Sequence, residues 1–305
     1  MHMQRGSSST PAWQASARRL RRWALIGAMA AATASSAQAA FLVFEAAGAD
    51  AAAITPTRDA FRGAIGGGTV AGPNGNFGDL RREINWDGTP AAFSAPFLLP
   101  GDFFNTTSPR GVVMSTPGTG LMVSANAGGV TAELFGFPGD LHAFSPQKLF
   151  GVVGSRVLDI RFFVPGTSTP ATTKAFGAVF VDLDDNNAQD FTSMEFFDSA
   201  DQLLFTRTGL PAGNQGLTFL GGVAAGLEQI ARVRITTPDN FLLANGERAN
   251  EVTDFVIMDD FIYASPAAVP EPEAWAMLLA GLGAVVGLAR RRSSHRPNPA
   301  QRQAL

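Results

Sequence analysis

The feature that most restricts the fold of this 305-residue chain is a succession of short runs rich in Val, Ile, Phe and Thr. Gly, Pro, Asn and Asp separate the runs, which is the composition of β-strands joined by turns. In VLDIRFFV (157–164), apolar residues alternate with Asp159 and Arg161, so one face of the strand is apolar and the other is polar. The pattern predicts antiparallel sheets with one solvated surface.

Strands are expected along the whole body, whereas helical periodicity is scarce. The expected strands are 84–86, 97–99, 110–115, 120–125, 130–137, 157–164, 174–183, 193–197, 202–208, 216–223, 229–237 and 254–264. One short helix is expected over 57–65, ended by Gly66-Gly67-Gly68, and the four residues 198–201 suit a hairpin. Many short strands without alternating helices predict an all-β fold, an antiparallel β-sandwich or jelly-roll-like ectodomain.

The first 39 residues have the order of a secretory signal peptide. Four arginines between Arg18 and Arg22 precede an apolar segment at 23–34, and Ala37-Gln38-Ala39 is a small-x-small cleavage site. The sequence therefore predicts that residues 1–39 form a signal helix, recognised by the Sec translocon and cleaved at Ala37–Ala39.

The charge of the body differs from that of the whole chain. Between Ala40 and Ala268 there are 24 Asp and Glu against 13 Lys and Arg, a net charge of −11. An acidic body argues against nucleic acid as a partner. The chain also contains no cysteine, which excludes a disulfide framework and a thiol nucleophile.

One acidic segment follows the expected strand 174–183 and has the composition of a calcium site, because calcium takes hard oxygen ligands. Its candidate ligands are Asp182, Asp184, Asn186 and Asp190. Asp260 is a further candidate; in a regular strand it points away from Asp259, so only one of the two can reach a given site. A solvated β-turn is the alternative, because Asp and Asn tolerate left-handed backbone geometry.

Patterns for catalysis are weak. His142 is the one histidine between residues 40 and 268, and no nucleophile elbow surrounds the nearby Ser145. Glu195 and Asp198 are the best glycosidase pair, but the sequence gives no separation between them. No catalytic residue and no enzymatic activity are therefore predicted.

An apolar run near the C-terminus is followed by a basic stop. Residues 274–289 would make a helix of about 24 Å, which is short against a hydrocarbon core of about 30 Å. Arg290, Arg291 and Arg292 follow it and would remain on the cytoplasmic side. The sequence predicts a short transmembrane helix in the inner membrane, a basic cytoplasmic tail at 293–305 and an exported body.

Val269-Pro270-Glu271-Pro272, the apolar run and the three arginines together resemble the PEP-CTERM protein-sorting tail of exported proteins of Gram-negative bacteria. The resemblance implies that 267–292 is a sorting and anchor segment and that an exosortase, a membrane enzyme, processes the protein at the Pro-Glu-Pro motif. It further implies a membrane-anchored precursor that ends at the cell surface or in the extracellular matrix, often among exopolysaccharide. Residues 40–266 are then the ectodomain.

The body also resembles a set of exported bacterial proteins. The stretches that carry this resemblance are FRGAIGGG (61–68), RREINWDG (81–88), PGDFFNTTSPRGVVMSTPGTG (100–120), FSPQKLF (144–150), FGAVFVDLD (176–184), FLGGVA (219–224) and ARVRIT (231–236). The resemblance implies a shared fold and transfers no catalytic residue.

Several functions stay open for the ectodomain. The leading interpretation is a surface- or matrix-associated protein without enzymatic activity. The alternative is a carbohydrate-binding module for exopolysaccharide with a structural calcium, in which Trp86, Phe103 and Phe104 either line a sugar platform or belong to the core. A glycan hydrolase and an ice-binding protein are weaker alternatives, the latter because no Thr ladder of fixed spacing is visible.

Overall fold

The computed structural model describes residues 41–125, 134–185, 190–226 and 229–269, together with Gly281 and Val285. All of them belong to a compact unit that begins at Ala39. Its helices are α2 (Ala51–Ile65) and α3 (Phe103–Thr106), with 3-10 turns η1 (Pro73–Gly75), η2 (Ala91–Phe93) and η3 (Leu134–Gly136). Its strands are β1 (Phe41–Gly48), β2 (Asn76–Phe77), β3 (Arg81–Ile84), β4 (Val112–Ser115), β5 (Gly120–Val123), β6 (Phe150–Val153), β7 (Val157–Phe162), β8 (Ala171–Thr172), β9 (Ala175–Val181), β10 (Ser193–Phe197), β11 (Leu203–Thr208), β12 (Leu217–Ala224), β13 (Arg232–Thr236), β14 (Ile257–Ala264) and β15 (Ala267–Ala268).

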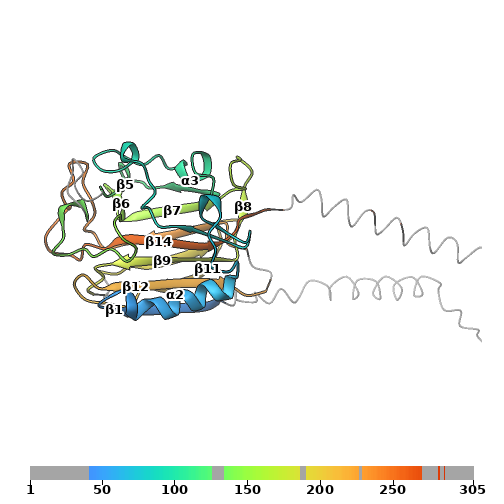
Figure 1. Ribbon diagram of the computed structural model, residues 1–305, viewed down its shortest axis with the longest axis horizontal. Coiled ribbons are helices and arrows are strands. Elements are labelled where there is room, and N and C mark those ends of the chain that lie inside the picture. Colours follow the sequence, from blue (N-terminus) through green and yellow to red (C-terminus); the bar gives the residue numbers. More distant parts are fainter. Residues whose placement is uncertain are drawn as a thin grey trace, which may run out of the picture. The chain divides into compact units, whose positions relative to one another are not determined.

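The strands form two main antiparallel sheets (Figure 1). Sheet A has the order β1-β12-β9-β14-β3-β2, with β6 also paired to β14 and β5 paired to β6. Sheet B has the order β11-β10-β13-β7-β4, and β8 pairs separately with β15. Neighbours in space are seldom neighbours in sequence, as in the crossing connections of a sandwich. The prediction of an all-β antiparallel sandwich is confirmed.

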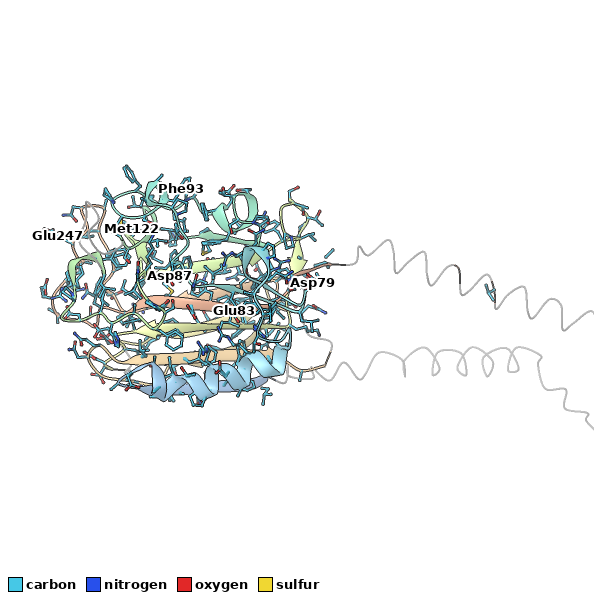
Figure 2. The ribbon with its side chains drawn as sticks, in the orientation of Figure 1. Asp79, Glu83, Asp87, Phe93, Met122 and Glu247 are labelled. Atoms are coloured by element: carbon cyan, nitrogen blue, oxygen red, sulfur yellow. The ribbon has the colours of Figure 1, made fainter. Side chains whose placement is uncertain are left out.

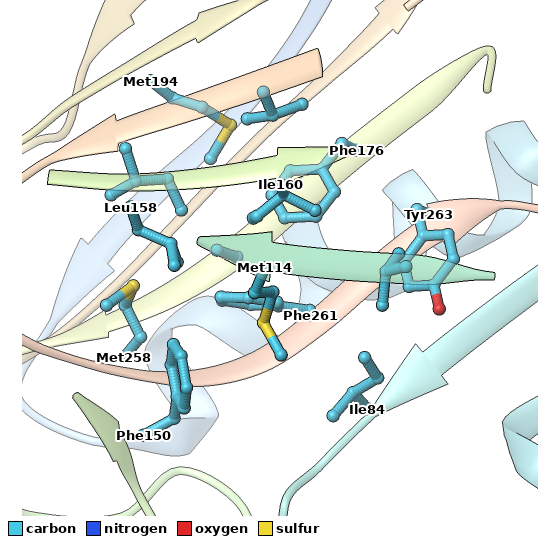
Figure 3. Close-up of a cluster of buried hydrophobic side chains, with 14 of the residues drawn as sticks. Ile84, Met114, Phe150, Leu158, Ile160, Phe176, Met194, Met258, Phe261 and Tyr263 are labelled. Carbon is cyan, nitrogen blue, oxygen red and sulfur yellow. The ribbon is translucent and has the colours of Figure 1, made fainter. Parts of the chain in front are cut away.

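The larger core lies between the two sheets (Figure 3). Phe176 and Phe261 of sheet A meet Ile160 and Met194 of sheet B, and all four side chains are buried. Each large apolar side chain contributes about 1.5–3 kcal/mol when fully buried. Because the chain has no disulfide, burial of this kind is what holds the sandwich together.

The other face of sheet A is covered as well, by α2 and by loops. Figure 1 shows α2 alongside β1 and β12, with which it makes its main contacts. The ring centroids of Phe61 and Phe219 lie 5.4 Å apart, and a Cβ at Gly221 would come within 2.9 Å of the Phe61 ring. The absence of a side chain at Gly221 of β12 therefore leaves room for Phe61 of α2. With both faces covered, β9 is buried along its whole length and shows no alternation.

Helix α2 is longer than the sequence predicted. Asp50 accepts a hydrogen bond from the N–H of Ala53 at 3.1 Å, which caps the N-terminus, and Gly66 ends the helix with a φ of 93°. Pro56 argues against a helix before residue 57, but it removes only one backbone hydrogen bond. Packing of Ile54 and Phe61 on sheet A outweighs that loss.

Most of the predicted strands exist, and the exceptions have physical causes. Residues 97–99 make only the single bridge between Leu99 and Leu121, and 134–136 form the turn η3 with Phe135 at a φ of 58°. Strand β3 ends at Ile84, before the predicted run 84–86 is complete, because Trp86 has a φ of 63°. Strand β1, with the sequence FLVFEAAG, was not expected; it pairs with β12 along its whole length.

The outer face of sheet B is polar, as its alternation predicted. Asp159 accepts hydrogen bonds from Arg232 and Arg234 at 2.9–3.0 Å, while Arg161 projects beside them with half its side chain exposed. Arg232 and Asp159 are 8% and 17% exposed, whereas Arg234 is 39% exposed, so the pairs lie at the border between the sheet and solvent. Sheet A is thus a buried middle layer and sheet B an outer one.

The two predicted terminal segments lie outside the described residues. These are the signal segment with Ala37 and Ala39, and the sorting segment from Pro270 onward, of which only Gly281 and Val285 are described. Pairing of the ectodomain continues to Ala268, where β15 meets β8. Within the described part of the chain, no helix is long and apolar enough to cross a membrane.

Candidate functional site

The structure brings part of the predicted calcium segment together. Asp182, Asp184 and Asp254 each place a carboxylate oxygen within 4.8 Å of the others, and we name these three residues the acidic cluster. Asp182 and Asp184 follow β9, whereas Asp254 precedes β14. The antiparallel pair Ile257–Val181 brings the end of β9 next to the start of β14. The cluster is therefore a consequence of sheet A.

Burial raises the pKa of two members of the acidic cluster to about 7. For Asp182 burial is the main cause, opposed by the hydrogen bond from the N–H of Gln215 and supported by the charges of Asp184 and Asp140. For Asp254 burial again leads, opposed by the bond from the N–H of Asp184 and supported by Asp182. Asp184 is the most exposed of the three, and its pKa is also raised, first by partial desolvation of its carboxylate and then by repulsion from other carboxylates. These acids oppose one another's ionisation.

The other predicted ligands have different positions. Asp190 accepts a hydrogen bond from the N–H of Asp254 at 3.1 Å, so it borders the acidic cluster, and Asn186 lies outside the described residues. Asp260 lines a different site together with Arg62 and Glu83. Asp254 was missed by the sequence prediction. The signal for it was its place at the first residue of the expected strand 254–264, and only the pairing of β14 with β9 shows that this end lies beside Asp182.

A β-bulge corrects the expectation for Asp259 and Asp260. Met258 pairs with Phe180 and Phe261 pairs with Ala178, so both aspartates stand opposite the single Val179. Met258 and Phe261 both face the core between the sheets. The two aspartates therefore share the face turned toward α2, and the prediction that they point to opposite faces is wrong.

Asp259 holds a loop in place. Its carboxylate accepts hydrogen bonds from the N–H of Phe144 at 2.7 Å, from the N–H of Ser145 at 3.0 Å and from the Ser145 hydroxyl at 3.0 Å. The side chain is fully buried, and burial followed by the charge of Asp260 raises its pKa well above the usual range. Ser145 is thus a structural partner of Asp259.

A pocket of about 550 Å³ opens beside the bulge. Its charged residues are Arg58 and Arg62 from α2, Glu83 from β3, Arg110 from the segment before β4, and Asp260 from β14; we name it the arginine pocket. Figure 2 labels Glu83, which projects from β3 beside α2. Known ligand pockets have volumes of about 300–1,000 Å³. A second hollow of about 650 Å³ shares Arg58 and Arg62.

Ion pairs organise most of the charges around the arginine pocket. The Glu83 carboxylate forms ion pairs with Arg62 at 2.5 Å and with Arg81 at 2.6 Å. A guanidinium nitrogen of Arg58 lies 2.8 Å from the Asp59 carboxylate. Arg58 also lies over the Phe144 ring, 4.9 Å from its centroid, so the arginine is fixed between an acid and an aromatic face. The Arg62–Glu83 and Arg58–Phe144 contacts join elements far apart in sequence.

Two groups in the arginine pocket are incompletely paired among the described residues. Arg110 donates only to neutral oxygens, the Ser108 hydroxyl and the Glu83 carbonyl, and burial lowers its pKa. Asp260 is 5% exposed, and its Oδ1 has no hydrogen-bond partner there. Burial raises the pKa of Asp260 to about 6, against a side-chain hydrogen bond with Ser145 and the attraction of Arg62 and Arg58.

The remaining candidates have structural roles. Asp198 accepts hydrogen bonds from the N–H groups of Ala200 and Gln202 and closes the β10–β11 hairpin. Trp86 stacks on Phe150 with centroids 4.1 Å apart and donates its indole N–H to the Asp259 carbonyl. Phe103 and Phe104 are buried in the same core. Of the two roles left open for these aromatic residues, a sugar platform or the core, the structure shows the core.

No curated protein matches this chain at significant similarity. One family model does match: the PEP-CTERM protein-sorting motif, over residues 268–293. The match begins at the last residue of β15 and contains the Val269–Pro272 segment and the three arginines 290–292. This motif indicates an exported protein that an exosortase-type enzyme processes. The chain therefore carries a PEP-CTERM protein-sorting motif at residues 268–293, behind a body that is a β-sandwich.

Proposed function

We propose that this chain is a non-enzymatic protein of the cell surface or extracellular matrix, exported through the Sec translocon and held briefly in the inner membrane before processing. The observation that carries the proposal is the sorting motif placed directly after β15. Arg290, Arg291 and Arg292 then stop translocation, because basic residues remain on the cytoplasmic side. Cleavage near Pro270-Glu271-Pro272 would release the sandwich.

The test replaces Pro270, Glu271 and Pro272 by alanine in the native host. We expect the full-length form to accumulate in the inner membrane, while the wild-type chain is found in a shorter form at the surface or in the medium. Immunoblots of cell fractions measure both forms. A matched control substitutes Asp239, an exposed acid of the body, by Asn. Normal processing of the triple-alanine chain would overturn the proposal.

The absence of catalysis is supported by what the polar groups do. Ser145 is engaged by Asp259, and His142 is exposed on a loop. Among the described residues, Glu195 and Asp198 belong to a strand and to its turn. None of these groups forms a nucleophile–base pair of the kind that acyl transfer requires.

A second candidate property is a structural calcium at the acidic cluster. Calcium takes six to eight oxygen ligands, and Asp182, Asp184 and Asp254 converge to supply three of them. Oδ1 of Asp254 is buried and has no hydrogen-bond partner among the described residues, so it is available to a cation. A divalent cation would also remove the mutual repulsion that raises these pKa values.

Binding of exopolysaccharide is the remaining alternative for the body. The buried positions of Trp86, Phe103 and Phe104 remove the platform first considered for it. Such binding would have to use a polar surface. The arginine pocket is lined by charged side chains, and its volume lies in the range of known ligand pockets.

A further inference from the structure

The arginine pocket carries an excess of cations in a body that is acidic as a whole. Counting both adjoining hollows, four arginines (Arg58, Arg62, Arg81 and Arg110) line them, against the three acids Asp59, Glu83 and Asp260. The body as a whole has 24 acids and 13 basic residues. The local excess of cations favours an anionic ligand there, because clefts concentrate ions of opposite charge.

Arg110 identifies the chemical group that is missing. Its guanidinium is largely removed from solvent and bonds only neutral oxygens among the described residues. Its ring contact with Phe104, 5.0 Å from the centroid, fixes its plane. A buried cation without an anionic partner is costly, and a planar guanidinium pairs best with a carboxylate. Arg110 therefore calls for a carboxylate.

Asp260 identifies a second group on the same ligand. Asp260 lines the same pocket, and its Oδ1 has no hydrogen-bond partner among the described residues. An ionised carboxylate can only accept hydrogen bonds. The neighbouring acids Asp59 and Glu83 are already paired with arginines. A hydroxyl donor would satisfy Asp260, whereas a second carboxylate would be repelled.

We propose that the arginine pocket binds a small hydroxylated carboxylate, such as a sugar acid, with its carboxylate at Arg110 and Arg58 and a hydroxyl donated to Asp260. A guanidinium has five N–H donors, and the contacts of Arg58 with Asp59 leave donors for a ligand. The Phe144 ring beside Arg58 supplies an apolar wall for the carbon skeleton. Binding at this pocket does not depend on the sorting motif, so it extends beyond the proposed function.

Titration calorimetry on the full-length chain in mild detergent tests the proposal, with glucuronate and galacturonate as probes. Glucose and acetate are the matched controls, since each carries only half of the proposed recognition. We expect saturable binding of a uronate, and binding at least about tenfold weaker for glucose and for acetate, because a hydrogen bond to a charged group contributes about 1.5–3 kcal/mol. No saturable binding of either uronate overturns the proposal, and so does glucose binding as tightly as the uronates.

Substitutions assign the binding to the pocket. Arg110→Gln and Asp260→Asn should each weaken uronate binding at least about tenfold, whereas Arg161→Gln, on the open face of sheet B, should leave it unchanged. Melting curves check that each variant is folded. If Arg110→Gln does not fold, Arg58→Gln replaces it, because the ion pair that Arg58 makes within the described ranges is with the exposed Asp59. Uronate binding that survives in the folded pocket variants overturns the assignment.

Discussion

The acidic cluster and the arginine pocket border the same strand, β14, and differ in what their carboxylates face. In the acidic cluster, Asp182, Asp184 and Asp254 face one another, and each raises the cost of ionising its neighbours. In the arginine pocket, Asp260 faces Arg62 and Arg58. The first arrangement needs a cation, whereas the second already contains an excess of cations. Composition alone would treat both as acidic sites.

The bulge gives two adjacent aspartates of β14 different roles. Asp259 is fully buried and bonded by three donors of the 144–145 loop, whereas Asp260 has an oxygen without such a partner. Adjacent residues of one strand thus have a structural and a ligand-facing role. The following predictions test these two contrasts.

The largest effect is expected from Asp259→Ala. The substitution leaves the part-buried N–H groups of Phe144 and Ser145 and the Ser145 hydroxyl without their acceptor, so the free energy of unfolding should fall by about 3 kcal/mol or more. Asp260→Asn removes a buried charge and keeps a side-chain oxygen that can accept from Ser145, so it should change the free energy by less than about 1 kcal/mol. Chemical denaturation of both variants measures the difference. Equal losses would show that the two aspartates have the same role.

A smaller effect is expected from calcium. At a hundredfold excess over its dissociation constant, calcium should stabilise the chain by about 2.7 kcal/mol and raise the melting temperature, because it binds the folded acidic cluster. The double variant Asp182→Asn, Asp184→Asn should lose this response, whereas Asp239→Asn should keep it. Calorimetric scans with calcium and with a chelator measure the shift. A melting temperature indifferent to calcium would leave the cluster as a solvated turn.

The smallest effect is a pH dependence of the calcium-free chain. Asp182 and Asp254 have pKa values of about 7 when folded, against about 3.9 for an unperturbed Asp. The folded state therefore holds more protons between these values, and its extra stability is present below about pH 4 and lost as the pH rises through 7. We expect the free energy of unfolding to fall by about 1 kcal/mol or more between pH 5 and 8.

Asp182→Asn serves as the control for the pH experiment, because an amide does not titrate and should flatten this slope. Saturating calcium should flatten it as well, since the metal binds the ionised carboxylates. A calcium-free stability that rises from pH 5 to 8 would show that these acids are not held in the way described.

Much of the fold could be predicted because its signals are local. Alternation in 157–164 correctly gave β7 with one solvated face, and the turn residues at 198–201 correctly gave the β10–β11 hairpin. β1 could not be predicted in this way, since Phe41–Gly48 is held by its pairing with β12. The length of α2 likewise depends on packing against sheet A, which outweighs the helix-breaking tendency of Pro56.

The candidate sites were less predictable, because they join segments far apart in the chain. Asp254 lies beside Asp182 only because β14 pairs with β9. Arg110 and Asp260 line one pocket together with residues of α2 and β3. The bulge at Asp259–Asp260 is one extra residue in a strand, and it reverses which face Asp260 occupies. No local sequence pattern in β14 predicts this bulge.

The sequence by itself determined the class of fold, the acidic charge of the body and the sorting motif at 268–293, because each is a property of consecutive residues. The tertiary structure alone decided which carboxylates gather, which of them face arginines, and that Trp86 belongs to the core. The physical reason is that sheet pairing and burial bring together side chains that are distant in sequence. The groups that then surround a carboxylate decide whether it attracts a metal ion, fixes a loop or binds a ligand.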